Sequence, residues 1–170
     1  FADARLFNQP IGGWDTSAVK SMDAMFREAR AFNQNISDWN TSSVTTTRSM
    51  FYRAHGFNQN IGGWDVSSVI AMRGMFYQAY AFSDANKGLI HESFSSNPNW
   101  AYDWREFVIL DDSNFQTAVN LWFDNQAEAN ATYGHISDWN TSAVTDMSEA
   151  FKGRTKFNED ISGWDVSSVS

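Results

Sequence analysis

Apolar residues recur along the chain at fixed positions of a 25-residue repeat. The repeat reads F-x-x-A-x-x-F-N-Q-x-I-x-x-W-D/N-T/V-S-x-V-x-x-M-x-x-M, and one tryptophan marks each of its copies. These tryptophans are Trp14, Trp39, Trp64, Trp139 and Trp164. A period of this length indicates units that bury their apolar face against the next copy. We therefore expect a stacked core in which each residue meets its equivalent in the neighbouring repeat.

Each repeat has two halves with different spacing. In the second half the apolar residues step by three and four, as one face of a helix does. In the first copy they are Val19, Met22, Phe26 and Ala29. Ser17 precedes them and is a typical helix N-cap, so the pattern predicts a helix over residues 18–29. The other half, residues 7–14, predicts a short strand with a bulge or turn at Gly12 and Gly13.

Stacking such units predicts an α/β fold with a parallel ladder of short strands and one helix in each coil. We expect the repeated tryptophans to be buried, with each indole N–H bonded to neighbouring backbone. The Asn at positions 8, 33, 58 and 158 should form an internal hydrogen-bonded ladder. The Asp or Asn after each repeated tryptophan, such as Asp15 and Asn40, should form an Asx turn.

Residues 83–134 lose the motif but keep its register. Residues 83–96 predict a helix that Ser83 or Asp84 caps and whose apolar face holds Leu89, Ile90 and Phe94. A second helix should begin after Asp112 or Ser113, with a shorter helical stretch from Gln126 to Thr132.

The chain thus divides into a repeat array at 1–82, a helical, acidic capping or insert region at 83–134, and the start of a second array at 135–170. One interpretation places terminal caps at 83–104 and 105–134, because an open end coil would expose its apolar cross-section. The other is a single unbroken solenoid with two degenerate coils.

Composition narrows the functions. The chain has 170 residues, no cysteine and a net charge of −8, of which the interruption carries most. This excludes disulfides and cysteine-ligated metals, and it argues against a nucleic-acid partner, which needs clustered Lys and Arg. No run is long and apolar enough for a membrane span. The chain begins without Met, so we expect a fragment or a processed piece.

No arrangement of residues indicates catalysis, a metal or a cofactor. The three histidines stand outside any known metal motif, and we expect His91 on the surface of its helix. Asp111–Asn114 is rich in oxygen but lacks the alternating spacing of a calcium loop, and a helix cap explains it. We therefore expect no enzyme, no catalytic residue, no metal and no cofactor.

Two further groups of residues are candidates for ligands. Trp100, Tyr102, Trp104 and Trp122 form an aromatic cluster that suits a sugar, although burial is the favoured interpretation. Four N-glycosylation sequons begin at Asn35, Asn40, Asn130 and Asn140, of which only Asn130 lies outside the repeat motif.

The phrases FNQNISDWNTSSV, FNQNIGGWDVSSV and FNEDISGWDVSSV resemble the 25-residue repeat of BspA-type leucine-rich-repeat-like surface proteins, over residues 1–82 and 135–170. The resemblance implies a leucine-rich-repeat-like α/β solenoid and an extracellular or cell-surface protein used in adhesion, recognition or assembly. It supplies no catalytic residues.

Small residues between the repeated Ile and Trp predict a flat binding strip for a protein partner. Its members are Gly12, Gly13, Ser37, Asp38, Gly62, Gly63, Ser137 and Asp138. Two alternatives are a structural subunit of a filament or surface layer that stacks through its solenoid ends, and a carbohydrate-binding module at the aromatic interruption.

Overall fold

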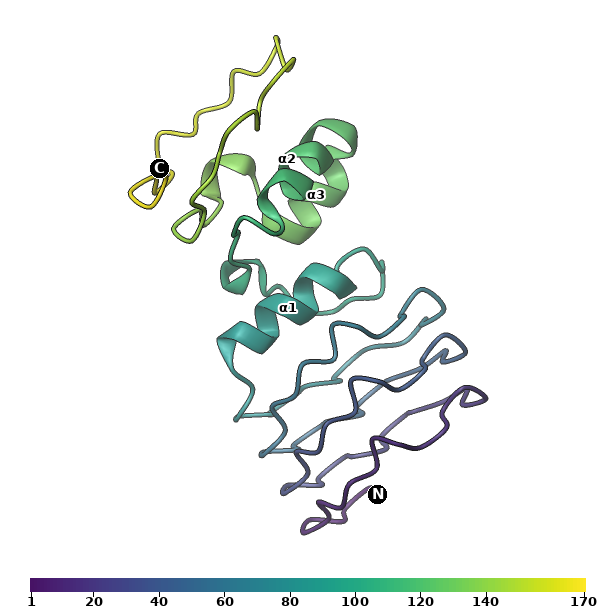
Figure 1. Cartoon of the computed structure of the whole chain (residues 1–170). Coiled ribbons are helices and arrows are strands. Elements are labelled where there is room, and N and C mark those ends of the chain that lie inside the picture. The colour runs from purple at the N-terminus through teal and green to yellow at the C-terminus, as the bar shows by residue number, and fades with distance from the viewer. The chain divides into compact units, whose positions relative to one another are not determined.

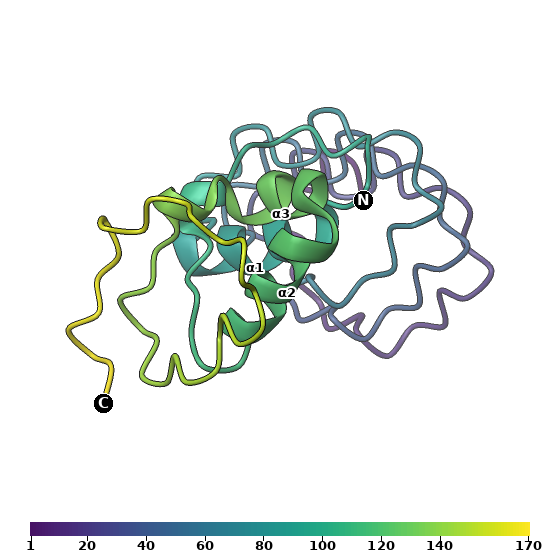
Figure 2. The ribbon, with the colours of Figure 1, turned by 90° about the horizontal axis from the view of Figure 1, so that it is seen from above.

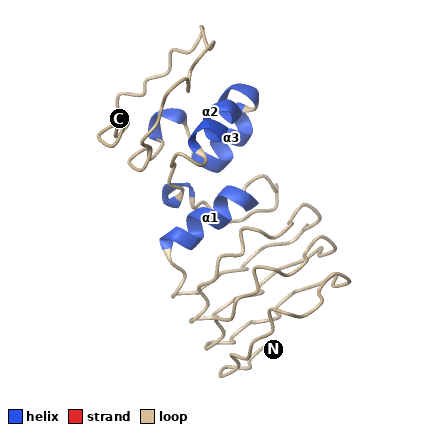
Figure 3. Cartoon of the chain, viewed as in Figure 1, coloured by secondary structure: helices blue, strands red, loops and turns tan.

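A computed structural model describes all residues from Phe1 to Ser170, and the chain forms two compact units, Phe1–Asp103 and Trp104–Ser170. The first contains the helix α1 (Asp84–Phe94). The second contains α2 (Phe115–Asp124), α3 (Gln126–Tyr133) and two 3-10 turns, η1 (Arg105–Phe107) and η2 (Ile136–Asp138). Figure 1 labels the helices, and Figure 3 shows that the rest of the chain is loop and turn. No helix is long and apolar enough to cross a membrane. The boundary between the units falls inside the interruption at 83–134.

Repeats of the first unit stack as irregular coils that overlie one another (Figures 1 and 2). Alternate backbone N–H groups of one coil donate to carbonyls of the next, 24 residues further along. Thus the N–H groups of Ala24 and Phe26 donate to Arg48 and Met50 at 2.9 Å. One repeat later the N–H of Phe51 donates to the carbonyl of Met75 at 2.8 Å. The 25-residue period of the sequence is therefore a physical period of the backbone.

The predicted helix in each coil is wrong. Residues 18–29 contain no helix, because Ala24 and Glu28 have φ of 53° and 57°, in the left-handed region that a right-handed helix cannot include. Consecutive turns occupy the segment instead: the N–H of Met25 donates to the carbonyl of Met22, and that of Ala29 donates to Phe26. Turns closed over three residues bury every third or fourth side chain, so they reproduce the apolar spacing of a helix.

The expected fold class, an α/β leucine-rich-repeat-like solenoid with short parallel strands, is also wrong, because the structure has no sheet. Its only bridges are isolated: Ser21 with Thr46, Thr46 with Ala71, and Asp111 with Ala143. A turn at the predicted bulge explains the missing strand. The N–H of Trp14 donates to the carbonyl of Ile11, which also accepts the indole N–H of Trp39 at 3.1 Å, so turns and side chains take the groups that a sheet needs.

Ladders of identical aromatic rings fill the core of the first unit. The rings of Phe26, Phe51 and Phe76 stack with centroids 5.7 and 5.6 Å apart, and those of Trp39 and Trp64 lie 6.2 Å apart. A second ladder joins Phe32, Phe57 and Phe82. The Trp64 indole donates to the carbonyl of Ile36 at 3.0 Å. Burial of the repeated tryptophans and their indole bonds are as predicted, except in the first coil, where Trp14 is 48 % exposed.

Polar ladders run beside the rings. The amide oxygens of Asn8 and Asn33 accept the backbone N–H groups of Asn33 and Asn58 at 2.9 and 2.8 Å, and Asn58 accepts from Ser83. The predicted Asx turns are present too: Asp15 accepts from the backbone N–H and hydroxyl of Ser17. Ser17 is therefore a turn donor and caps no helix.

Helix α1 packs on the last coil of the first unit. Ser83 caps it by accepting the N–H of Asn86 at 3.3 Å, which confirms the predicted start. Ile90 and Phe94 are fully buried, but Leu89, predicted on the same face, is 48 % exposed. Asn97 follows the helix and donates to the carbonyls of Val66 at 2.6 Å and Val69 at 2.9 Å.

The second unit has its own core between α2, α3 and the coils that follow. The two predicted helices are present, but the predicted caps of α2 are wrong because Asn114 occupies its N-cap. Asp112 instead accepts hydrogen bonds from Thr145 and Asp146 in the first coil of this unit. Asn125 caps α3 by accepting the N–H of Glu128 at 3.3 Å.

Candidate functional site

In the predicted strip of small residues, one glycine of each pair is needed for packing between neighbouring segments of backbone. A Cβ atom on Gly12 would lie 2.5 Å from the carbonyl oxygen of Asn35, and one on Gly62 would lie 2.9 Å from that of Leu89. Glycine is required there because neighbouring backbone approaches so closely. Gly13 and Gly63 face open space. Each glycine pair thus offers one packing residue and one exposed residue.

The polar members of the strip bond to their own neighbours. The Ser37 hydroxyl donates to Asp38 at 3.3 Å, and the Ser137 hydroxyl lies 3.2 Å from Asp138. Ser37 and Ser137 are half-buried, and both aspartates are exposed. The strip offers a partner little besides these carboxylates.

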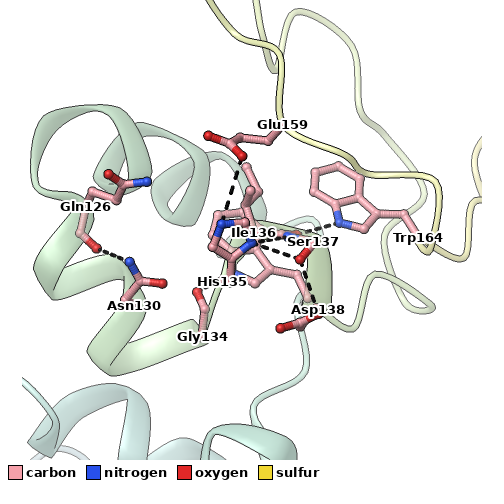
Figure 4. Close-up of polar contacts among 10 residues, drawn as sticks. Gln126, Asn130, Gly134, His135, Ile136, Ser137, Asp138, Glu159 and Trp164 are labelled. Carbon is pink, nitrogen blue, oxygen red and sulfur yellow. Dashed lines mark hydrogen bonds and ion pairs between the residues drawn. The ribbon is translucent and has the colours of Figure 1, made fainter.

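Figure 4 shows a Ser–His–Glu arrangement around Ser137 in the second unit. Nδ1 of His135 lies 2.8 Å from the Ser137 hydroxyl, and Nε2 lies 3.9 Å from the carboxylate of Glu159. The same Nδ1 accepts the backbone N–H of Ser137, which is the N-cap bond of η2. Because His135 and Glu159 are also nearly half exposed, capping explains the contact better than catalysis does. No group of three or more His, Asp or Glu side chains is placed to hold a metal.

The candidate aromatic residues are divided between the units. Trp100 and Tyr102 belong to the first, whereas Trp104 and Trp122 belong to the second. The Tyr102 hydroxyl accepts the backbone N–H of Phe76 at 2.8 Å, and burial raises its pKa. Trp122 is 4 % exposed and packs edge-on against Trp139. Trp104 is half-buried at the start of η1. Trp122 is buried and the other three are half-buried, so none of the four presents a fully exposed ring.

His91 is 2 % exposed, so its predicted surface position is wrong. Its Nδ1 accepts the indole N–H of Trp100 at 2.8 Å. The pair joins α1 to the turn that follows it, and this explains why a histidine is tolerated in the core.

Three of the four sequon asparagines, Asn35, Asn40 and Asn140, are exposed, and their side-chain oxygens accept bonds within Asx turns. Asn130 is half-buried in α3, where its amide nitrogen donates to the carbonyl of Gln126 at 2.9 Å (Figure 4). Asn130, which begins the sequon outside the repeat, is thus the one whose side-chain amide nitrogen already donates a hydrogen bond.

An open groove of about 590 Å³ crosses three coils of the first unit, and sequence reasoning missed it. We call it the arginine–tyrosine groove. Its lining residues are Asp23, Ala24, Arg27, Arg48, Ser49, Tyr52, Arg73, Gly74 and Tyr77. Ala24, Ser49 and Gly74 occupy one repeat position and all have positive φ, 53°, 54° and 70°. The same sharp turn in each coil thus lines up the side chains that flank it.

The long side chains of the groove support one another. The rings of Tyr52 and Tyr77 stack 5.0 Å apart, and the guanidinium of Arg27 lies 5.9 Å from the Tyr52 ring centre. Arg48 forms an ion pair with Asp23 at 2.8 Å, and this hydrogen bonding raises the pKa of Arg48. Arg73 is exposed and has neither a salt bridge nor a side-chain hydrogen bond.

A signal for this groove exists in the sequence. All six arginines of residues 1–82 fall at only four positions of the repeat, those of Asp23, Arg27, Glu28 and Arg30. These positions differ from copy to copy, so they are absent from a consensus that records only what recurs. Variable positions on a fixed frame are where a repeat protein places its binding residues.

The chain was compared with known proteins. The model of a family described as "Mycoplasma protein of unknown function, DUF285" matches residues 1–89 and 110–170. The chain belongs to this family. The unmatched residues contain the end of α1, the Trp100 turn and η1, so this DUF285 chain has an unmatched segment at the junction of its two units. No curated protein and no solved structure matches the chain.

Proposed function

We propose that this DUF285 protein is a non-enzymatic binding protein of the cell surface or extracellular space, and that it recognises another protein through the arginine–tyrosine groove. The groove is the observation that carries the proposal. Arginine and tyrosine are enriched at protein interfaces and dominate their binding energy. Rings and guanidinium groups held by stacking lose little freedom on binding.

The surface location rests on the resemblance of the repeat to BspA-type proteins, and it suits a chain whose core needs no cysteine. An open groove 590 Å³ in volume, spread over three coils, suits a protein segment better than an enclosed small molecule.

Binding of the fluorescently labelled chain to intact cells, before and after mild protease treatment of the cells, tests the proposal. We expect saturable binding that protease removes. Tyr52→Ala with Tyr77→Ala should weaken it at least about thirtyfold, because each aromatic anchor contributes more than about 1 kcal/mol at a typical hot spot. Tyr80→Ala is the matched control, since Tyr80 is 70 % exposed and packs at a tilt against His55 outside the groove. Binding that resists protease, or that the groove variant leaves unchanged, would overturn the proposal.

End-to-end assembly into a filament or surface layer is the second candidate, because the first coil presents apolar rings. Trp14 is 48 % exposed and Phe1 is 41 % exposed, whereas Trp39 in the next coil is 3 % exposed. Any coil laid on this face, from the same chain or from another copy, gains the contacts that Trp39 makes. Mass photometry separates the candidates: a ladder of oligomers that Trp14→Ser abolishes supports assembly, and a monomer at all concentrations rejects it.

A further inference from the structure

We infer that the arginine–tyrosine groove takes an acidic segment of its protein partner, with partner carboxylates on Arg27 and Arg73 and partner backbone or apolar groups on the tyrosine rings. This inference rests on the proposed function and adds the chemistry of the partner. Three features of the groove support it: its charge, the pairing of its acids, and its rings.

The charge of the groove is opposite to that of the chain. The chain carries a net charge of −8, yet the groove contains three arginines and a single carboxylate, that of Asp23. Two other acids of the repeats, Asp15 and Asp65, bond within Asx turns at the other half of the coil. A local positive surface on an acidic protein steers an anionic partner to one place.

The acids near the groove are already paired. Asp23 binds Arg48 at 2.8 Å. Glu28 is 7 % exposed and binds Arg30 and Arg53 at 2.8 and 3.2 Å. Arg27 and Arg73 have no ion pair, so their charges are available to a partner.

The two available arginines lie in different coils: Arg27 occupies the repeat position of the stacked Tyr52 and Tyr77, one coil ahead of Tyr52, and Arg73 lies in the same coil as Tyr77. Arginine binds a carboxylate through two parallel hydrogen bonds, which fixes direction as well as charge. A segment with spaced carboxylates therefore matches the groove better than a single anion does.

The test uses the whole chain and fluorescence anisotropy with a short labelled peptide that alternates Glu and Ala, and with its Gln–Ala counterpart, at low and physiological salt. We expect the Glu peptide to bind at least about tenfold more tightly, with an advantage that falls as salt rises. Arg27→Gln with Arg73→Gln should remove that advantage. The matched control is Arg5→Gln with Lys20→Gln, which changes the net charge equally at two exposed positions outside the groove and should retain it.

Several outcomes would overturn the inference: equal binding of both peptides, equal loss in both double variants, tighter binding of a sulfated oligosaccharide than of the Glu peptide, or self-association that competes with the peptide. Its failure is separable from that of the proposed function. If cell binding is protease-sensitive and needs Tyr52 and Tyr77 but ignores Arg27 and Arg73, the proposed function stands and the acidic partner falls. If protease leaves cell binding intact, the proposed function falls.

Discussion

Thr45 in the first unit and Thr145 in the second occupy the same position of the repeat, but they bond to different acceptors. The backbone N–H and hydroxyl of Thr45 donate to the carbonyl of Lys20 in the preceding coil, at 2.8 and 3.0 Å. The equivalent groups of Thr145 donate to the carboxylate of Asp112, at 2.7 and 2.5 Å. A coil therefore needs an acceptor at a fixed place, and a side chain ahead of a helix supplies it as well as another coil does.

The aromatic cores differ in the same way. Where coil meets coil, equivalent rings stack almost parallel, as Phe26 and Phe51 do at 6°. Where coil meets helix, rings pack edge-on, as Trp122 and Trp139 do at 89°. Both geometries are favourable for aromatic pairs, so the same motif tolerates either neighbour. Edge-on packing against a helix therefore ends the stack of parallel rings and still covers its outermost ring.

Truncating one ring of each core tests this difference, with the largest expected effect. Phe51→Ala removes a fully buried ring that stacks on Phe26, Phe57 and Phe76, and it should cost about 3–5 kcal/mol of unfolding free energy. Phe151→Ala removes the equivalent half-buried ring and should cost less. Denaturant unfolding, with hydrogen exchange to assign the loss to a unit, measures both. Equal losses would contradict the prediction that the fully buried ring in the stacked ladder contributes more than its half-buried equivalent.

The end of the first stack should be the next most sensitive place. Asn97→Ala removes the donor to the Val66 carbonyl and the shorter of two bonds to the Val69 carbonyl, and it should cost about 1–3 kcal/mol. Asn99→Ala is the control, because it removes only a long bond to Val69 at 3.4 Å and a bond to the Asn97 side chain at 3.2 Å. If thermal unfolding does not separate the two variants, the Asn97 bonds are not what closes the stack.

The stack of the first unit contains one buried hydroxyl without a hydrogen-bond partner, and its removal should stabilise the protein. Thr47 is 2 % exposed, its hydroxyl has no hydrogen-bond partner, and its equivalents Met22 and Met72 are buried methionines. Thr47→Val keeps the shape and removes the unpaired hydroxyl, so it should raise the unfolding free energy by about 1 kcal/mol. Thr46→Val should give no gain, since the Thr46 hydroxyl accepts from Arg48. A lower melting temperature for Thr47→Val would contradict the assignment of that hydroxyl as unpaired.

Part of this structure can be predicted from the sequence. The 25-residue period and the identity of the inward-facing residues follow from recurrence, because identical side chains in a stack must meet, as Trp39 and Trp64 do. Local signals predict the helix α1 and the Asx turns, since Ser83 and Asp15 act within a few residues. The helix and strand expected in each coil fail because successive turns have the same apolar spacing, and only the left-handed φ of residues such as Ala24 distinguishes them.

The arginine–tyrosine groove escapes prediction for a different reason. Its residues lie at positions that vary among the repeats, so recurrence conceals them, and only the stacking of coils brings Arg27, Arg48 and Arg73 to one side. The strip of small residues was mispredicted for the opposite reason. Its residues do recur from repeat to repeat, but Gly12 and Gly62 recur because neighbouring backbone packs against them.

Low pH should cause a small loss of stability in the second unit, where the Asp112 carboxylate takes the place of a backbone carbonyl as the acceptor for Thr145. Hydrogen bonds from the Thr145 hydroxyl, then from the backbone N–H groups of Thr145 and Asp146, lower the pKa of Asp112. A carboxylate whose pKa is lower in the folded state stabilises that state above its ordinary pKa of about 3.9, and the contribution is lost as pH falls through the lowered value. Asp112→Asn keeps an acceptor but cannot titrate. Melting temperatures measured from pH 7 to pH 2 should therefore show a neutral-pH deficit for Asp112→Asn that closes in acid, whereas Asp124→Asn, exposed on α2, should track the unmodified chain. A deficit that stays constant down to pH 2 would mean that the variant loses stability through altered acceptor geometry and that the charge of Asp112 contributes nothing.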